Sequence, residues 1–221
     1  MSDLFDYLNE GISDLHPYEP GRSIEDVIAE YRPEKIVKLA SNENPLGPSP
    51  KAVEALKLHN DDLHLYPDGD SKKLKALIAK HESLDVSNII VGNGSNEVLE
   101  LAARAFLNKD TSALMSKHAF AVYKIVTQSN GSKIIEVPTV DWRHSLNDFS
   151  NYIEDSTRVC FVANPNNPTG TYNSHDEFKS MMDSIPSSIL VILDLAYFEY
   201  VTEQDYVRVN ELLEKYSNLL V

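Results

Sequence analysis

From residue 88 onward, short apolar runs alternate with stretches in which apolar residues recur at helical spacing. The runs predict strands over residues 89–91, 113–115, 134–137, 159–163 and 189–193. Helices are expected between them, over residues 95–107, about 120–128 and 175–182, and again over 211–216. Because the runs are apolar on both faces and helices separate them, we predict an α/β fold with a mainly parallel sheet covered by helices.

Residues 1–50 differ from the rest because prolines and glycines interrupt them at short intervals. They predict an arm lying over a surface, with one helix near Ser23 to Tyr31. A second helix should begin at Ser49-Pro50, since proline is tolerated in a first helical turn. We therefore divide the chain into an N-terminal arm, residues 1–50, and a large domain, residues 51–221.

The chain carries 20 Lys and Arg against 34 Asp and Glu, which gives a formal net charge of −14. This charge opposes binding to nucleic-acid backbones and to anionic lipid surfaces, so we expect neither as a partner. No stretch predicts a signal peptide or a membrane span, and the single cysteine, Cys160, lies in an apolar run and fits a reducing compartment. We expect a cytoplasmic protein, and no metal site because the histidines lack ligand spacing.

Polar residues that directly follow apolar runs are the first candidates for chemistry, because ligands of open α/β sheets bind beyond the carboxyl ends of the strands. The first such place is Gly92-Asn93-Gly94-Ser95-Asn96-Glu97, which opens a helix. Its glycines and free backbone amides suit a phosphate group. The alternative is an ordinary capped helix start, with Ser95 or Gly94 as the N-cap. Glu97 stands where a dinucleotide-binding motif has its third glycine, so that motif is excluded.

The second and third places follow the next apolar runs. Asn164-Pro165-Asn166-Asn167-Pro168-Thr169-Gly170 presents asparagine amides at a strand end, where the alternative is a plain turn. Asp194-Leu195-Ala196-Tyr197 places a carboxylate at the end of a buried strand, which is costly unless a cation or several donors compensate it. A positively charged ligand is one such compensation, and a cap for the next helix is the alternative role.

Together, these three places resemble the fold-type I aminotransferases, which depend on pyridoxal 5′-phosphate. Residues 39–50, 66–69 and 16–21 resemble the histidinol-phosphate aminotransferase branch in particular. The resemblance implies the three-layer large domain of that fold. It also implies that the domain is truncated here, since residues 219–221 look like a strand just begun.

The resemblance also implies roles for single residues. The backbone at Gly94, Ser95 and Asn96 would seat the cofactor phosphate, and Phe120 would stack on the pyridine ring unless it is simply a core aromatic. Asn167 and Tyr197 would hydrogen-bond the phenolic oxygen. Asp194 would pair with the pyridine nitrogen and keep it protonated, so that the ring acts as an electron sink.

Further roles concern a second subunit and the substrate. Tyr66 would reach the cofactor phosphate of the other subunit of a homodimer, although an ordinary turn aromatic is a strong alternative. Tyr18, Asn42 and Asn44 would border the substrate. The lysine that binds the cofactor covalently would lie beyond Val221, so the chain as given is expected to be inactive.

The implied reaction exchanges the amino group of L-histidinol phosphate with 2-oxoglutarate, which gives imidazole acetol phosphate and glutamate in histidine biosynthesis. Three alternatives stay open. They are another fold-type I aminotransferase acting on aromatic amino acids, a relative of threonine-phosphate decarboxylase, and a non-catalytic module for dimerisation or cofactor binding. Leu195 and the Lys117-His118-Ala119-Phe120 segment depart from the family's pattern without removing a cofactor contact.

Overall fold

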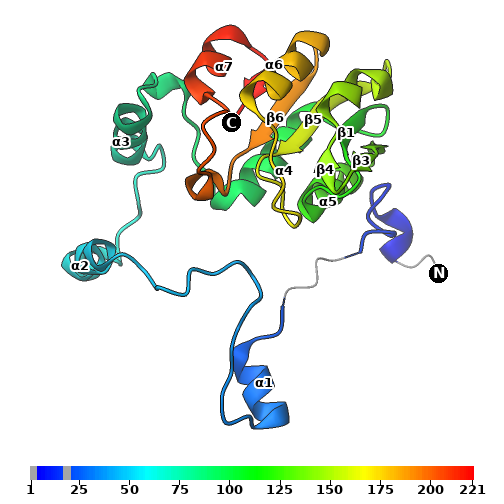
Figure 1. Ribbon diagram of the computed structural model, residues 1–221. Helices are drawn as coiled ribbons and strands as arrows, with labels where there is room; N and C mark the ends of the chain where they lie inside the picture. Colours follow the sequence, from blue (N-terminus) through cyan, green and yellow to red (C-terminus); the bar gives the residue numbers. More distant parts are fainter. Residues whose placement is uncertain (1–3, 17–20) are drawn as a thin grey trace. The chain divides into compact units, whose positions relative to one another are not determined.

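The structure is a computed structural model that describes residues 4–16 and 21–221 (Figure 1). It divides into a unit of Met1–Pro17 with Lys75–Val221 and a second unit of Tyr18–Leu74.

The first unit is built on a five-stranded sheet with the order β2-β1-β5-β6-β7, in which all paired strands are parallel. The strands are β1 Ser112–Ser116, β2 Lys133–Val137, β5 Thr157–Ala163, β6 Leu190–Asp194 and β7 Leu219–Leu220. A separate antiparallel hairpin pairs β3 Thr139–Val140 with β4 Arg143–His144. The predicted runs at 113–115, 134–137, 159–163 and 189–193 are therefore confirmed as strands.

Helices cover both faces of this sheet (Figure 1). The helices of the unit are α4 Gly94–Phe106, α5 Ala121–Ser129, α6 His175–Ser184 and α7 Val209–Lys215, with most of α3 Lys72–Glu82. Short 3-10 helices are η1 Leu4–Tyr7, η3 Val86–Asn88, η4 Leu146–Tyr152 and η5 Phe198–Tyr200. Each predicted helix from residue 95 onward is present, with bounds shifted by at most a few residues.

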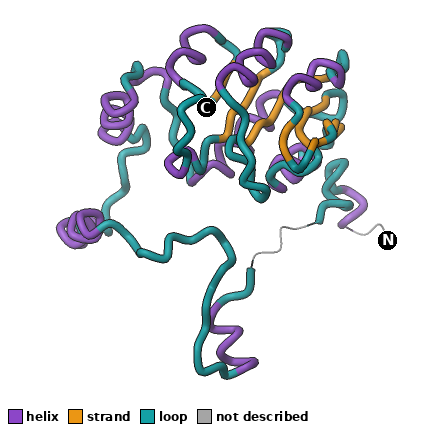
Figure 2. The backbone as a smooth tube through the Cα atoms, viewed as in Figure 1, coloured by secondary structure: helices purple, strands orange, loops and turns teal. Residues whose placement is uncertain are grey.

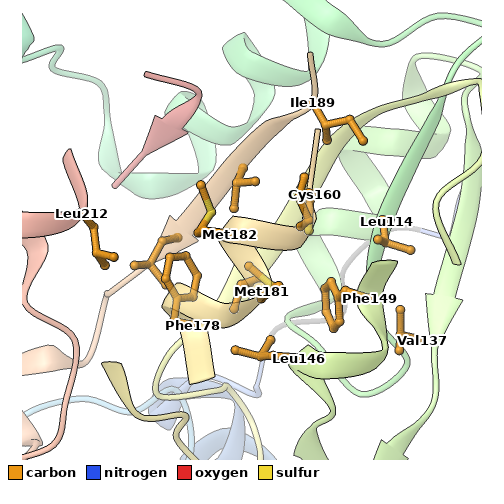
Figure 3. Packing of buried hydrophobic residues seen from close by; sticks show 14 of the residues in the cluster. Leu114, Val137, Leu146, Phe149, Cys160, Phe178, Met181, Met182, Ile189 and Leu212 are labelled. Carbon is orange, nitrogen blue, oxygen red and sulfur yellow. The ribbon is translucent and has the colours of Figure 1, made fainter. Parts of the chain in front are cut away.

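Alternate residues of each central strand enter different cores. One core joins one face of the sheet to η4, α6 and α7, and Figure 3 shows Phe178, Met181 and Met182 of α6 in it with Cys160 of β5. The other core joins the opposite face to α4 and α5. The strands are apolar on both faces because helices cover both sides of the sheet. The unit therefore has three layers, with the sheet between two layers of helices.

The predicted strand at residues 89–91 is wrong. The segment is extended at Ile89 but pairs with no strand among the described residues, and Ile90 and Val91 are 58% and 40% exposed. An apolar run becomes a strand only where a neighbouring strand accepts its backbone hydrogen bonds. The run nevertheless leads directly into α4, as the sequence pattern indicates.

The second unit contains helices joined by long loops (Figure 2). They are α1 Ile24–Tyr31, α2 Pro50–Leu58 and η2 Asn60–Asp62, followed by the start of α3. Ser23 caps α1 by accepting a hydrogen bond from the Asp26 amide at 3.0 Å, and Pro50 occupies the first turn of α2. None of the described residues of this unit is buried. Within the described residues of the whole chain, no helix combines the length and the apolar character needed to span a membrane.

Candidate functional site

Two of the predicted places lie next to each other at the carboxyl edge of the sheet. Strands β5 and β6 are neighbours, with Ala163 opposite Asp194. The Asn164 amide continues the ladder and donates to the Asp194 carbonyl at 2.9 Å. The asparagine loop 164–170 and the segment 194–197 therefore leave the sheet side by side, as expected for a ligand site at this edge.

The Asp194 carboxylate is half-buried and receives a donor on each oxygen. Tyr123 donates its hydroxyl to Oδ2 at 2.9 Å, and the Ala196 amide donates to Oδ1 at 3.1 Å. Tyr123 is completely buried, and burial together with the charge of Asp194 raises the pKa of its hydroxyl well above the usual value. The hydroxyl therefore stays a donor, and the carboxylate is oriented by the chain itself.

Asp194 does not cap a helix. The next helical segment is η5, whose N-cap is Tyr197, and the backbone donor to Asp194 comes from Ala196 in a local turn. Sequence reasoning missed Tyr123, since a tyrosine on an apolar helix face gives no sign that its hydroxyl reaches a strand end.

Asn167 and Tyr197 are brought together. The Asn167 amide nitrogen lies 3.3 Å from the Tyr197 hydroxyl, and both side chains are half-buried. They come from the two adjacent loops, so the pair presents an amide donor and a hydroxyl at one place. Two such donors can stabilise an oxyanion between them.

Phe120 is the N-cap residue of α5 and is half-buried. Its ring meets the Tyr123 ring edge-to-face, with 5.7 Å between centroids, and Tyr123 in turn stacks on Phe161 at 4.8 Å. Tyr123 therefore contacts two predicted site residues, Phe120 through its ring and Asp194 through its hydroxyl. The structure thus links the predicted stacking residue to the predicted carboxylate.

The asparagine loop is held by further bonds that the sequence did not reveal. Asn164 and Asn173 exchange two hydrogen bonds, from the Asn164 amide nitrogen to the Asn173 carbonyl at 2.9 Å and from the Asn173 backbone to Asn164 Oδ1 at 2.8 Å. Tyr206 donates its hydroxyl to the Asn164 carbonyl, and the Asn164-Pro165 and Asn167-Pro168 peptide bonds are cis. The hydrogen bonds of Asn164 make this loop a fixed structure rather than a plain exposed turn.

The first turn of α4 carries Gly94, Ser95 and Asn96, which are all exposed. The helix begins at Gly94, and its N-cap is Asn93, whose side chain makes no capping bond. The alternative interpretation, in which Ser95 or Gly94 is the N-cap, is therefore wrong. Glu97 instead reaches back to accept the Asn93 amide at 2.6 Å. Among the described residues no hydrogen bond joins this turn to Asp194.

The remaining predicted residues belong to the second unit, and Tyr18 lies outside the described residues. Tyr66 is 100% exposed. Asn44 closes a local turn by accepting the Leu46 amide at 3.0 Å, and Asn42 has a positive φ of 48°. Within the described part of the chain, no three His, Cys, Asp or Glu side chains are grouped to hold a metal ion.

Comparison with known proteins places this geometry in a family context. Residues 34–221 match the model of the family described as aminotransferase class I and II. The chain is 45% identical over 213 residues to histidinol-phosphate aminotransferase 2 of Pseudomonas fluorescens, covering 96% of this chain and 58% of that protein. It is 44% identical over 207 residues to histidinol-phosphate aminotransferase of a Geobacillus species, covering 94% and 57%. The chain thus spans somewhat more than half the length of these curated relatives.

Solved structures show the same fold. The histidinol-phosphate aminotransferase of Sinorhizobium meliloti, in complex with pyridoxal-5′-phosphate, superposes with a TM-score of 0.77 at 24% identity, covering 81% of this chain and 49% of that one. L-threonine-O-3-phosphate decarboxylase of Porphyromonas gingivalis superposes with a TM-score of 0.65 at 23% identity, covering 76% and 51%. The predicted fold class is confirmed by these similarities and by the observed sheet.

Proposed function

The chain belongs to the aminotransferase class I and II family, and from this premise we propose that its carboxyl-edge site holds pyridoxal 5′-phosphate. The observation that carries the proposal is the Asp194 carboxylate at the end of β6, oriented by Tyr123 and Ala196 and next to the Asn167–Tyr197 pair. A fixed carboxylate beside two polar donors fits a ligand that has a cationic ring nitrogen and an anionic ring oxygen.

The residues present fit the cofactor group by group. Asp194 would accept a hydrogen bond from the protonated ring nitrogen, because a neighbouring carboxylate favours the charged form of that nitrogen. Asn167 and Tyr197 would donate to the phenolic oxygen, and Phe120 would stack on the ring. The helix start at Gly94, Ser95 and Asn96 would bind the phosphate, since the Asn93 side chain makes no capping hydrogen bond there. The Gly94 amide donates to the Gly92 carbonyl at 2.9 Å, so the amides of Ser95 and Asn96 would be the phosphate donors.

When bound, pyridoxal phosphate supplies a protonated ring that takes up the charge left when the substrate's α-carbon loses a proton. The chain's own contribution is electrostatic. Tyr123 holds the Asp194 carboxylate in one orientation. The negative charge of Asp194 would therefore stay in a fixed position relative to the ring nitrogen. Donors that are fixed before the reaction need no reorganisation when charge develops, and this is where preorganised sites lower a barrier.

We propose that the enzyme to which these residues belong transfers the amino group of L-histidinol phosphate to 2-oxoglutarate in histidine biosynthesis. The names of the curated relatives and the resemblance in residues 39–50 support this substrate. We also propose that the lysine that binds the cofactor covalently is not among residues 1–221. The 221 residues are therefore proposed to bind the cofactor without a covalent bond and not to transaminate by themselves.

The same proposal includes a homodimer with shared sites. Tyr66 would contact the cofactor phosphate of the second subunit, while Tyr18, Asn42 and Asn44 would border the substrate. The complete exposure of Tyr66 is compatible with a role outside its own subunit.

The cofactor site is tested with pyridoxamine 5′-phosphate, which has the ring and phosphate but no aldehyde that could react with surface lysines. Its binding to the 221-residue chain is measured by calorimetry for the unchanged protein, Asp194→Asn and Asp183→Asn. Asp194→Asn keeps the shape but removes the charge that faces the ring nitrogen, so affinity should fall by about tenfold or more. Asp183 carries an exposed carboxylate on α6 that pairs with Lys215, so Asp183→Asn should leave affinity unchanged.

Equal affinities for all three proteins would contradict the assigned role of Asp194.

The substrate is tested in samples saturated with pyridoxal phosphate, where a bound ligand raises the melting temperature. L-histidinol phosphate should raise it more than L-phenylalanine does at equal concentration. Equal shifts would count against histidinol phosphate as the substrate.

A further inference from the structure

Asn166 lies between the two loops that carry predicted cofactor contacts. Its side chain is almost fully buried, at 3% exposure. The amide nitrogen donates to the His118 carbonyl at 2.9 Å and to Thr169 Oγ1 at 2.8 Å. The first bond joins the asparagine loop after β5 to the loop after β1, so one amide links two strand ends.

The orientation of this amide is fixed by its partners. A carbonyl oxygen can only accept, so the nitrogen rather than the oxygen of Asn166 must face His118. The Asn166 backbone is held as well, since its amide donates to the Thr171 carbonyl at 2.8 Å and its carbonyl accepts the Gly170 amide at 2.8 Å. The donor is therefore presented by a rigid loop.

Residues of the hairpin β3–β4 contact both of these loops. His118 accepts or donates at Nδ1 to Thr139 Oγ1 at 2.8 Å, and its ring lies 4.7 Å from the ring of Trp142. Thr171 donates to the Trp142 carbonyl at 3.3 Å and contacts Thr169 at 2.9 Å. Contacts therefore run in a closed circuit from His118 through Asn166, Thr169 and Thr171 to Trp142 and back to His118.

From this circuit we propose that Asn166 is a positioning residue, which fixes the segment before Phe120 relative to Asn167. The proposal rests on the cofactor role of Phe120 and Asn167 argued above. Asn166 directly precedes Asn167, and the His118 carbonyl that it binds lies two residues before Phe120. Because Asn166 is almost fully buried, it would touch neither the cofactor ring nor the substrate. It acts by holding the ring-stacking residue and the oxygen-binding amide at a constant separation.

The structural part of the proposal is tested without any ligand, by hydrogen exchange. The amides to follow are those of Ala119, bonded to the Ser116 carbonyl, and Tyr123, bonded to the Phe120 carbonyl. Asn166→Ala should speed exchange at both amides. Thr169→Val, which removes the second acceptor of the Asn166 amide and keeps the volume, should have a smaller effect in the same direction and serves if Asn166→Ala does not fold.

A matched control exists at the opposite edge of the sheet. The Asn218 amide nitrogen also donates to a distant backbone carbonyl, that of Ile189, at 2.8 Å. Asn218→Ala removes a comparable bond, so it should destabilise the fold without changing exchange at Ala119 and Tyr123. If Asn166→Ala and Thr169→Val leave exchange at these two amides unchanged, the positioning role is wrong.

The binding part is tested with pyridoxamine 5′-phosphate, whose binding can be followed by the emission of Trp142, the single tryptophan of the chain. Asn166→Ala should raise the dissociation constant about tenfold, the effect of one lost hydrogen bond on a preorganised site. Asn218→Ala should leave it within twofold of the unchanged protein, on the scale of these effects. A wild-type dissociation constant in folded Asn166→Ala would overturn the proposal. Absence of binding by the unchanged chain would instead refute the cofactor assignment, and hydrogen exchange would still decide the role of Asn166.

Discussion

At the scale of single residues, the site depends on how a carboxylate is held at the end of a buried strand. Asp194 is half-buried, and each of its oxygens has one donor from the chain. The Tyr123 donor comes from a completely buried side chain packed between Phe120 and Phe161. A hydrogen bond of this kind is stronger than one at the surface, because little water competes for it.

Replacing Tyr123 with phenylalanine removes this donor and keeps the ring packing. Hydrogen bonds to charged groups contribute about 1.5–3 kcal/mol, so Tyr123→Phe should lower the free energy of unfolding at neutral pH by about that amount. Urea denaturation measures the change. Because the pKa of Tyr123 is raised, its hydroxyl donates at mildly alkaline pH as well. Tyr123→Phe should therefore lower the free energy of unfolding by the same amount at that pH.

A matched control is Tyr172→Phe, which also removes a hydroxyl donated to an aspartate, Asp205, at 3.0 Å. That bond is exposed, so its loss should lower the free energy of unfolding by clearly less than the loss in Tyr123→Phe. If both variants lose the same stability, burial does not strengthen the Tyr123–Asp194 bond.

The site residues differ in whether the sequence alone could reveal them. The segments that carry Asp194, Asn167 and Tyr197 were singled out because polar residues directly follow apolar runs, while the cofactor roles of these residues came from the family resemblance. The structure brings the three residues to one edge of the sheet. Tyr123 and Asn166 were not assigned roles. Their contacts are with residues 71 and 48 positions away, and no local pattern carries that information.

At the scale of elements, the start of α6 is fixed from two directions. Ser174 and Glu177 form a capping box, in which Ser174 Oγ accepts the Glu177 amide at 3.3 Å and Glu177 accepts the Ser174 amide at 2.8 Å. Arg143 of the hairpin binds both oxygens of Glu177, at 2.8 and 2.5 Å. The capping box therefore orients the Glu177 carboxylate, which also binds Arg143 and so connects the hairpin to α6.

Ser174→Ala should cost about 1 kcal/mol, because it removes the cap acceptor of a helix whose inner face lies in the core. In a domain of this size the melting temperature should fall by about 2–4 °C, as measured by circular dichroism. Ser23→Ala removes a similar cap from α1, which has no buried residues, and should leave the melting temperature unchanged. An equal drop in both variants would show that the loss does not depend on packing.

Elements were predicted best where the pattern and the packing agree. Strands β1, β5 and β6 were predicted because each is apolar on both faces and lies inside the sheet. Strand β2 lies at the edge of the sheet with Lys133 and Glu136 exposed, and it was predicted from its apolar residues alone. The run 89–91 has the same composition, but it lacks a neighbouring strand among the described residues. The hairpin β3–β4 was missed, since strands of two residues leave no periodicity to detect.

At the scale of the whole molecule, the two units differ in what stabilises them. The unit of Met1–Pro17 and Lys75–Val221 holds the two hydrophobic cores, whereas the described residues of Tyr18–Leu74 include no buried side chain. Several large apolar side chains of the second unit are almost fully exposed, namely Leu39, Leu46, Leu63 and Tyr66. Segments with few buried apolar contacts open at low free-energy cost.

This difference, combined with the proposed homodimer, predicts how proteolysis depends on protein concentration. Thermolysin cuts beside exposed apolar residues, so in dilute solution it should cleave within residues 21–74 first and leave a resistant product that begins near Lys75. If a second copy covers the exposed apolar side chains, burial should slow this cleavage as concentration rises past the dissociation constant of the dimer. Mass spectrometry of the products and sedimentation of the intact chain measure both events in the same samples. Cleavage within residues 21–74 that is equally fast in monomeric and dimeric samples would mean that a second copy does not cover this unit.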